Sequence, residues 1–209
     1  DIDYLRTLNM FDEEFLSYLA DFKFDGTIWA VPEGTPVFPY EPLVTVKGKL
    51  IEAQLLETFL LVTINHQSLI ATKTHRIVQE AKGRPVMEFG ARRAQGYDGA
   101  TYGARAAYIG GAAGTATVSA GKAFGIPVLG TMAHSFVQSF DTEYDAFKAY
   151  AEIYPDSCIL LVDTYDTLKS GIPNAIRVAE EVLQPMGKTL AGIRIDSGDI
   201  AYLTKKARM

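Results

Sequence analysis

The first 23 residues carry apolar side chains at helical spacing, which predicts a helical beginning to the chain. Asn9 or Asp12 can cap the second part of this helical region. The next segment changes to short apolar runs that proline and glycine interrupt. Two of these runs, 27–31 and 43–47, are expected to form antiparallel strands joined by turns.

Residues 51–82 contain neither proline nor glycine, so we expect one long helix or two abutting helices that end at Gly83. From residue 85 onward, apolar strand candidates alternate with helix candidates. Strands are expected at 85–89, 126–130, 158–162 and 190–195, and helices at 97–109, 117–124, 143–153, 173–183 and from about residue 200.

Apolar strands joined by helical crossovers are typical of a parallel sheet that is buried on both faces. We therefore expect the α/β class, with an incomplete parallel α/β barrel at 85–209 that follows a smaller mixed α+β domain with linking helices at 1–84. The chain begins without Met and stops at Met209 inside a helical pattern. We interpret the first domain as truncated at its start and the barrel as truncated at its end.

Charge and cysteine content narrow the class of protein. The net charge is −5, from 25 acidic and 20 basic residues, whereas nucleic-acid and membrane-surface binding both need a basic field. Cys158 is the only cysteine, which excludes a disulfide framework and favours a reducing cytoplasm, and its apolar run indicates a small core residue. No run of residues has the length of a membrane span, and we expect no signal peptide before Asp1.

Ionisable side chains gather where the four expected strands from residue 85 onward end. In parallel α/β folds the carboxyl ends of the strands meet at one edge, where function concentrates. Arginines bind carboxylate or phosphate, aspartates bind Mg²⁺ or ribose hydroxyls, and a histidine beside an aspartate can serve as base or nucleophile. Together they suit a phosphorylated sugar, a metal ion and a nucleophilic histidine. The residues concerned are Phe89, Arg92, Arg93, Thr131, His134, Asp163, Asp166, Arg194, Asp196 and Asp199.

Structural interpretations of the same residues stay open. The adjacent arginines could only pair with surface acids, a lone strand-end histidine is more often structural, and Asp196 to Asp199 could be a turn with a helix cap. The glycines at 110, 111 and 114 are a weak phosphate-loop signal. No lysine stands at these strand ends, which disfavours a Schiff-base aldolase, and the spacing of His66 and His75 does not fit metal binding.

Five ordered phrases of the chain resemble those of the nicotinate phosphoribosyltransferases, which are type II phosphoribosyltransferases of NAD salvage. The resemblance covers essentially the whole chain. The phrases are NHQSLIATK at 65–73, EFGARRA at 88–94, GTMAHS at 130–135, LVDTYD at 161–166 and GIRIDSGD at 192–199.

The resemblance implies a chemistry and a role for most of the strand-end residues. The family makes nicotinate mononucleotide and pyrophosphate from nicotinate and phosphoribosyl pyrophosphate, with Mg²⁺, and couples this to ATP hydrolysis through a phosphohistidine. The resemblance also implies a cytoplasmic homodimer with a shared active site. His134 would carry the phosphoryl group and Asp163 would orient it, while Phe89 would stack on the pyridine ring. The resemblance also implies that Arg92 and Arg194 share the nicotinate carboxylate and a phosphate, that Thr131 binds substrate, and that Asp196, supported by Asp199, faces the ribose or Mg²⁺.

Ala116 bears on the choice of substrate. The similar enzymes that use nicotinamide carry an aspartate at this point, which can accept from the amide, whereas Ala116 cannot accept and does not repel an anion. We therefore predict nicotinate rather than nicotinamide. A quinolinate-using relative, expected to use several lysines, and a catalytically inactive barrel that binds a nucleotide remain the alternatives.

Overall fold

The computed structural model describes residues 1–209, and the chain falls into two compact units, Asp1–Leu129 and Gly130–Met209. Each unit is described by itself. The domain boundary expected near residue 84 stays a prediction. None of the helices is long and apolar enough to cross a membrane.

The first unit begins with two short helices, α1 (Ile2–Thr7) and α2 (Glu13–Ala20). The helical beginning is therefore confirmed, and Asp12 is the cap: its side chain accepts from the Phe15 backbone N–H at 2.7 Å. Asn9 lies in the break between the helices with a left-handed φ of 53°. The two predicted strands are confirmed as β1 (Thr27–Ala30) and β2 (Val44–Lys47), which pair antiparallel.

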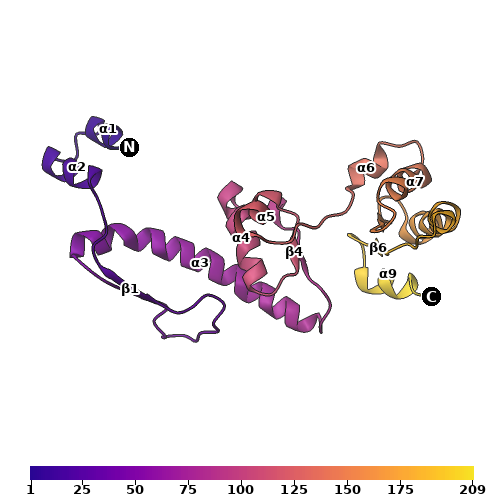
Figure 1. Ribbon diagram of the computed structural model, residues 1–209, viewed down its shortest axis with the longest axis horizontal. Coiled ribbons are helices and arrows are strands. Elements are labelled where there is room, and N and C mark those ends of the chain that lie inside the picture. Colours follow the sequence, from indigo (N-terminus) through magenta and orange to yellow (C-terminus); the bar gives the residue numbers. More distant parts are fainter. The chain divides into compact units, whose positions relative to one another are not determined.

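The helix α3 (Leu50–Glu80) runs without interruption, so the alternative of two abutting helices is wrong (Figure 1). Gly83 follows its end with a φ of +82°, a backbone conformation that glycine adopts without steric cost. Near its start, the buried Glu52 accepts from the Asp25 backbone N–H at 2.9 Å and pairs with Lys49 at 3.1 Å. Glu52 therefore ties the first turn of α3 to the loop before β1.

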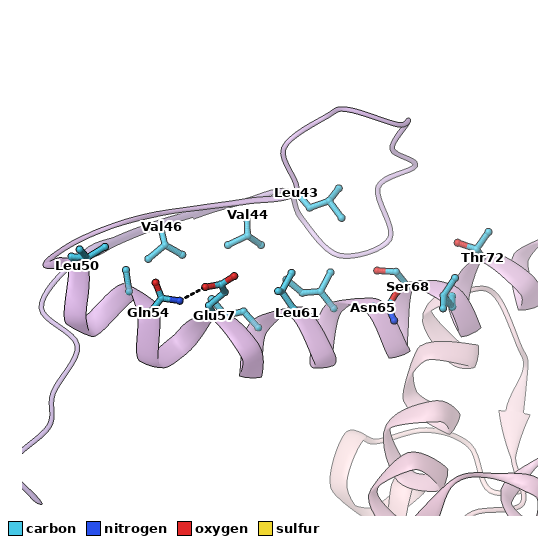
Figure 2. A pocket seen from close by; sticks show the side chains of 14 residues that line it. Leu43, Val44, Val46, Leu50, Gln54, Glu57, Leu61, Asn65, Ser68 and Thr72 are labelled. Atoms are coloured by element: carbon cyan, nitrogen blue, oxygen red, sulfur yellow. Dashed lines mark hydrogen bonds between the residues drawn. The ribbon is translucent and has the colours of Figure 1, made fainter. Parts of the chain in front are cut away.

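An apolar groove of about 650 Å³ lies between β2 and α3. Figure 2 shows Val44 and Val46 of β2 facing Leu61 and neighbouring side chains of α3 across it. Glu57 is the only charged residue that lines the groove, and it accepts from Gln54. The groove therefore lacks the paired ionisable groups that acid–base or phosphoryl chemistry needs.

The rest of the first unit consists of two short parallel strands with helices. It consists of β3 (Met87–Glu88), the 3₁₀ turn η1 (Ala91–Arg93), α4 (Gly96–Ile109), β4 (Gly114–Thr115) and α5 (Val118–Phe124). β3 pairs with β4 in parallel, and Thr115 forms a single parallel bridge with Val128. The helices expected at 97–109 and 117–124 are confirmed within one residue.

One expectation in this region is wrong, and one strand was not predicted. The strand expected at 126–130 is reduced to the bridge at Val128, and β4 follows a glycine-rich segment that indicated a loop. Gly114 is needed there: a Cβ at this position would lie 2.6 Å from the Pro127 carbonyl oxygen, so only glycine lets the two backbones approach.

The second unit packs helices around one parallel strand pair. Its elements are α6 (His134–Gln138), α7 (Glu143–Ile153), β5 (Ile159–Leu161), the π turn η2 (Thr167–Gly171), α8 (Ile172–Val178), the π turn η3 (Ala179–Leu183), the 3₁₀ turn η4 (Gln184–Met186), β6 (Gly192–Arg194) and α9 (Ile200–Lys206). β5 and β6 are parallel, with Leu161 opposite Arg194.

The core of the second unit explains why these strands form. Leu160, Leu161 and Val162 are fully buried and pack with Phe147 of α7 and Val178 of α8. A strand that is buried on both faces needs such a continuous apolar run, as the sequence predicted. The predicted helix at 143–153 is confirmed with the same bounds, and the helix expected at 173–183 is confirmed as α8 continued by the π turn η3.

The α/β class is confirmed in its coarse form. The two strand pairs beyond residue 85 are parallel and are connected through helices. Closure into a barrel stays a prediction.

Candidate active site

His134 lies in contact range of the ends of both strands of the second unit. It is the first residue of α6, a helix that the sequence analysis missed because residues 130–135 were interpreted only as a strand end. Its Nδ1 lies 3.1 Å from the Thr164 hydroxyl, which follows β5. Its Nε2 lies 3.5 Å from Asp196 Oδ2 and 4.0 Å from Asp163 Oδ1. The imidazole therefore has a hydroxyl on one nitrogen and two carboxylates near the other.

Asp163 joins the end of β5 to the end of β6. Its side chain is only 2% exposed, and its Oδ2 accepts from the Asp196 backbone N–H at 2.9 Å and from the Ser197 hydroxyl at 2.6 Å. Its Oδ1 is buried without a hydrogen-bond partner. A buried carboxylate oxygen without a donor is costly, so this atom is a strong acceptor for any N–H that approaches.

Arg194 and Asp196 form an ion pair beside the histidine. Arg194 Nη2 lies 2.9 Å from Asp196 Oδ2, and Nη1 donates to the Thr131 hydroxyl at 2.6 Å. Burial raises the pKa of Asp196, but the guanidinium of Arg194 and the nearby His134 outweigh it, so the pKa is lowered on balance. Asp196 is therefore ionised at neutral pH and can stabilise positive charge on the imidazole.

Asp199 makes none of these contacts and instead caps a helix. Its side chain accepts from the Tyr202 backbone N–H at 2.9 Å, which caps the start of α9. The structure thus shows Asp199 as a helix cap, and its support of substrate or metal binding stays a prediction.

Phe89 and Arg92 belong to the first unit, where Phe89 directly follows β3 and Arg92 lies on the turn η1. The side chains of both are exposed, at the carboxyl end of the β3–β4 pair as expected. Ala116 follows Thr115 on the neighbouring strand and donates its backbone N–H to the Glu88 carbonyl oxygen at 3.0 Å. The meeting of Phe89 and Arg92 with the His134 group stays a prediction.

The structure adds contacts that the sequence analysis did not assign. Thr164 and Ser197 lie inside the phrases singled out above, each directly after an aspartate, and their hydroxyls contact His134 and Asp163. Glu88 also lies inside such a phrase, and its carboxylate binds Gly90 and Thr115. A hydroxyl residue directly after each strand-end aspartate is the sequence signal that indicates these contacts.

The remaining candidates behave as structural residues. Burial raises the pKa of the Cys158 thiol to about 11, so this cysteine is an unreactive core residue as expected. His66 Nε2 lies 3.3 Å from the Gly99 carbonyl oxygen, and His75 hydrogen-bonds Gln79 on the same helix. No group of three or more His, Cys, Asp or Glu residues is arranged to hold a metal ion.

Two family models match the chain. The model of the nicotinate phosphoribosyltransferase N-terminal domain matches residues 1–65, and the model of the nicotinate phosphoribosyltransferase family matches residues 85–209. A nicotinate phosphoribosyltransferase of Mycobacterium tuberculosis is 50% identical over 208 residues, which cover 100% of this chain and 44% of the relative. That of Bacillus subtilis is 51% identical over 208 residues, which cover 100% of this chain and 42% of the relative.

Two solved structures are also similar. The crystal structure of human nicotinic acid phosphoribosyltransferase superposes with a TM-score of 0.89 at 32% identity, over 100% of this chain and 51% of that one. Nicotinate-nucleotide pyrophosphorylase from Pyrococcus furiosus superposes with a TM-score of 0.77 at 30% identity, over 88% of this chain and 47% of that one. The chain spans less than half the length of the two curated relatives.

Proposed function

The chain belongs to the nicotinate phosphoribosyltransferase family, and from this premise we propose that its protein joins nicotinate to phosphoribosyl pyrophosphate. The pyridine nitrogen attacks the anomeric carbon of the sugar, the bond from that carbon to the pyrophosphate oxygen breaks, and pyrophosphate leaves. Carboxylates near the anomeric carbon stabilise the oxocarbenium-like transition state of such a displacement.

The proposal includes ATP hydrolysis through a phosphohistidine at His134. The carboxylates of Asp163 and Asp196 near Nε2 favour a proton on that nitrogen, which leaves a lone pair on Nδ1. This lone pair forms a bond to the γ-phosphorus of ATP while the bond to the β–γ bridging oxygen breaks and ADP leaves. Water later hydrolyses the N–P bond and releases phosphate.

Asp163 is proposed to hold the imidazole during this transfer. Its orphaned Oδ1 lies 4.0 Å from Nε2, so a small rotation of the ring gives this buried oxygen the hydrogen bond that it lacks. Positive charge develops on the imidazole as Nδ1 attacks, and Asp163 and Asp196 both stabilise it. This group of contacts is the single observation that supports the proposal most strongly.

The substrate-binding roles divide between the two arginines. Arg194 pairs with Asp196 next to His134, so we assign Arg194 to a phosphate group of the substrate. The hydrogen bond that Arg194 donates to the Thr131 hydroxyl fixes the position of the threonine side chain. Arg92 is then assigned to the nicotinate carboxylate, with Phe89 stacking on the ring. Ala116 favours nicotinate because an aspartate there would repel the anion.

Magnesium fits this chemistry as a companion of the substrate. Carboxylate oxygens such as those of Asp196 suit Mg²⁺, and substrate phosphates supply the other ligands in sites of this kind. When bound, the ion withdraws charge from the departing pyrophosphate. A cytoplasmic homodimer with a shared site completes the proposal.

An assay of the full-length protein tests the function. With phosphoribosyl pyrophosphate, Mg²⁺ and ATP, nicotinate is expected to yield nicotinate mononucleotide and pyrophosphate at a rate at least tenfold above nicotinamide or quinolinate. Omission of ATP is expected to lower the rate. Equal turnover of quinolinate or nicotinamide, or binding without turnover, would replace this function with one of the alternatives.

A further inference from the structure

One hydrogen-bond network in the first unit, centred on the buried Thr115, connects the ends of β3 and β4. Glu88 Oε1 accepts from the Gly90 backbone N–H at 2.5 Å, and Oε2 accepts from the Thr115 hydroxyl at 2.6 Å. The Thr115 oxygen in turn accepts from the Thr117 backbone N–H at 2.9 Å. Thr115 is only 1% exposed, so water does not compete for its hydroxyl.

This network holds two segments that carry proposed pyridine-binding residues. Glu88 and Thr115 are opposite each other in the parallel register, and Phe89 and Ala116 are the next residues on the two strands. The Gly90 bond closes the backbone around Phe89 and begins the turn η1, on which Arg92 lies. A displacement of either strand end would therefore move the ring-stacking residue relative to Ala116.

The chain also shows why the turn takes this form. A Cβ at Gly90 would lie 3.0 Å from Glu88 Oε1, so the glycine allows the carboxylate to approach its backbone closely. A glutamate that only solubilised the strand end would need neither this glycine nor a buried threonine. The carboxylate satisfies two donors on two segments, which indicates that it sets their relative position.

We propose that Glu88 and Thr115 form a clamp that positions Phe89 and the following turn η1, which carries Arg92, against Ala116, and thereby sets the affinity for the pyridine substrate. The proposal rests on the proposed nicotinate activity. Both are positioning residues, because they act on the ring through the backbone and not by contact. Their loss is expected to raise the KM for nicotinate and to leave the site of the sugar substrate intact.

The test uses steady-state kinetics of the full-length enzyme with nicotinate, carried out on Thr115→Val and Thr115→Ser. Valine keeps the shape and removes the hydroxyl, and is expected to raise the KM for nicotinate about tenfold with kcat and the KM for phosphoribosyl pyrophosphate within about threefold. Serine keeps the hydroxyl and is expected to restore the KM to within about twofold. Thr101→Val, in α4, is the matched control because its hydroxyl binds only the Tyr97 carbonyl oxygen of the same helix.

A second variant covers the case in which Thr115→Val does not fold. Glu88→Gln keeps one acceptor oxygen but turns an amide N–H₂ toward one of the two donors, and is expected to raise the KM for nicotinate about threefold or more. Circular dichroism establishes that each measured variant is folded. An unchanged KM for nicotinate in a folded Thr115→Val or Glu88→Gln, or an equal rise in both KM values, overturns the clamp alone. No turnover of nicotinate by the unaltered enzyme overturns the proposed function and the clamp's ligand with it.

Discussion

Replacing Asp163 with asparagine probes the contact between the buried carboxylate and His134. The amide oxygen of asparagine can keep the bonds from Asp196 and Ser197, because both donors meet the same oxygen of Asp163. The amide N–H₂ then takes the place of the orphaned Oδ1 and faces Nε2 of the imidazole. The variant thus removes the negative charge and places an amide N–H₂ opposite the protonated Nε2, while the hydrogen bonds from Asp196 and Ser197 are kept.

The expected loss follows from the separation of the two groups. At an effective dielectric constant of about 20, two unit charges 4.0 Å apart interact by about 4 kcal/mol. His134 is 36% exposed, so solvent screening reduces this to roughly 2 kcal/mol. An increase of that size in the barrier slows phosphorylation of His134 about thirtyfold. Asp196 remains at 3.5 Å from Nε2, so we expect the activity to be reduced and not abolished.

The assay is a quenched time course of ³²P transfer from the γ-phosphate of ATP to Asp163→Asn and to the unaltered protein. Asp166→Asn is the matched control, since Asp166 lies three residues further on and caps η2 through the backbone of Leu168 and Lys169. A phosphorylation rate within twofold of the unaltered protein in a folded Asp163→Asn would refute the electrostatic argument.

Three further predictions concern Ala116, Gly171 and Asp196. Ala116→Asp is expected to raise the KM for nicotinate about tenfold by charge repulsion, and unchanged nicotinate kinetics would count against the specificity argument. Gly171→Ala is expected to destabilise the fold by about 3 kcal/mol, because its Cβ would collide with the Val162 carbonyl oxygen, and urea unfolding of the two proteins compares their stabilities. The lowered pKa of Asp196 means that its pairing with Arg194 stabilises the protein above the ordinary carboxyl pKa of 3.8 and that this contribution is lost as the pH falls below it. The difference in unfolding free energy between the unaltered protein and Asp196→Asn should accordingly shrink from pH 6 to pH 3, and a difference that stays constant would contradict the ion pair's role.

The helices of this fold follow from local sequence, whereas its strand pairing does not. The helix at 143–153 was predicted with its observed bounds because its apolar spacing and its acidic first turn are local signals. β4 has two residues, and its existence depends on Met87 and Val128, which lie far away in the sequence. A glycine such as Gly114 reads as a loop until the backbone that approaches it is known.

The candidate site shows the same division. Parallel strands bring their carboxyl ends together, so the chain alone predicted that His134, Asp163 and Asp196 would be neighbours. It could not predict which oxygen of Asp163 is already engaged by the β6 end, or that Thr164 would face Nδ1. These details depend on differences of about 1 Å in backbone position, which residue spacing does not encode.

Identification of the phosphorylated atom decides whether His134 carries the phosphoryl group. The full-length protein is incubated with Mg²⁺ and γ-labelled ATP and quenched in alkali, and its peptides are mapped for acid-labile phosphate. Label is expected on Nδ1 of His134, and it should be lost on addition of nicotinate and phosphoribosyl pyrophosphate and be absent from His134→Ala. Sustained, ATP-stimulated formation of nicotinate mononucleotide with no label on His134 would contradict this expectation.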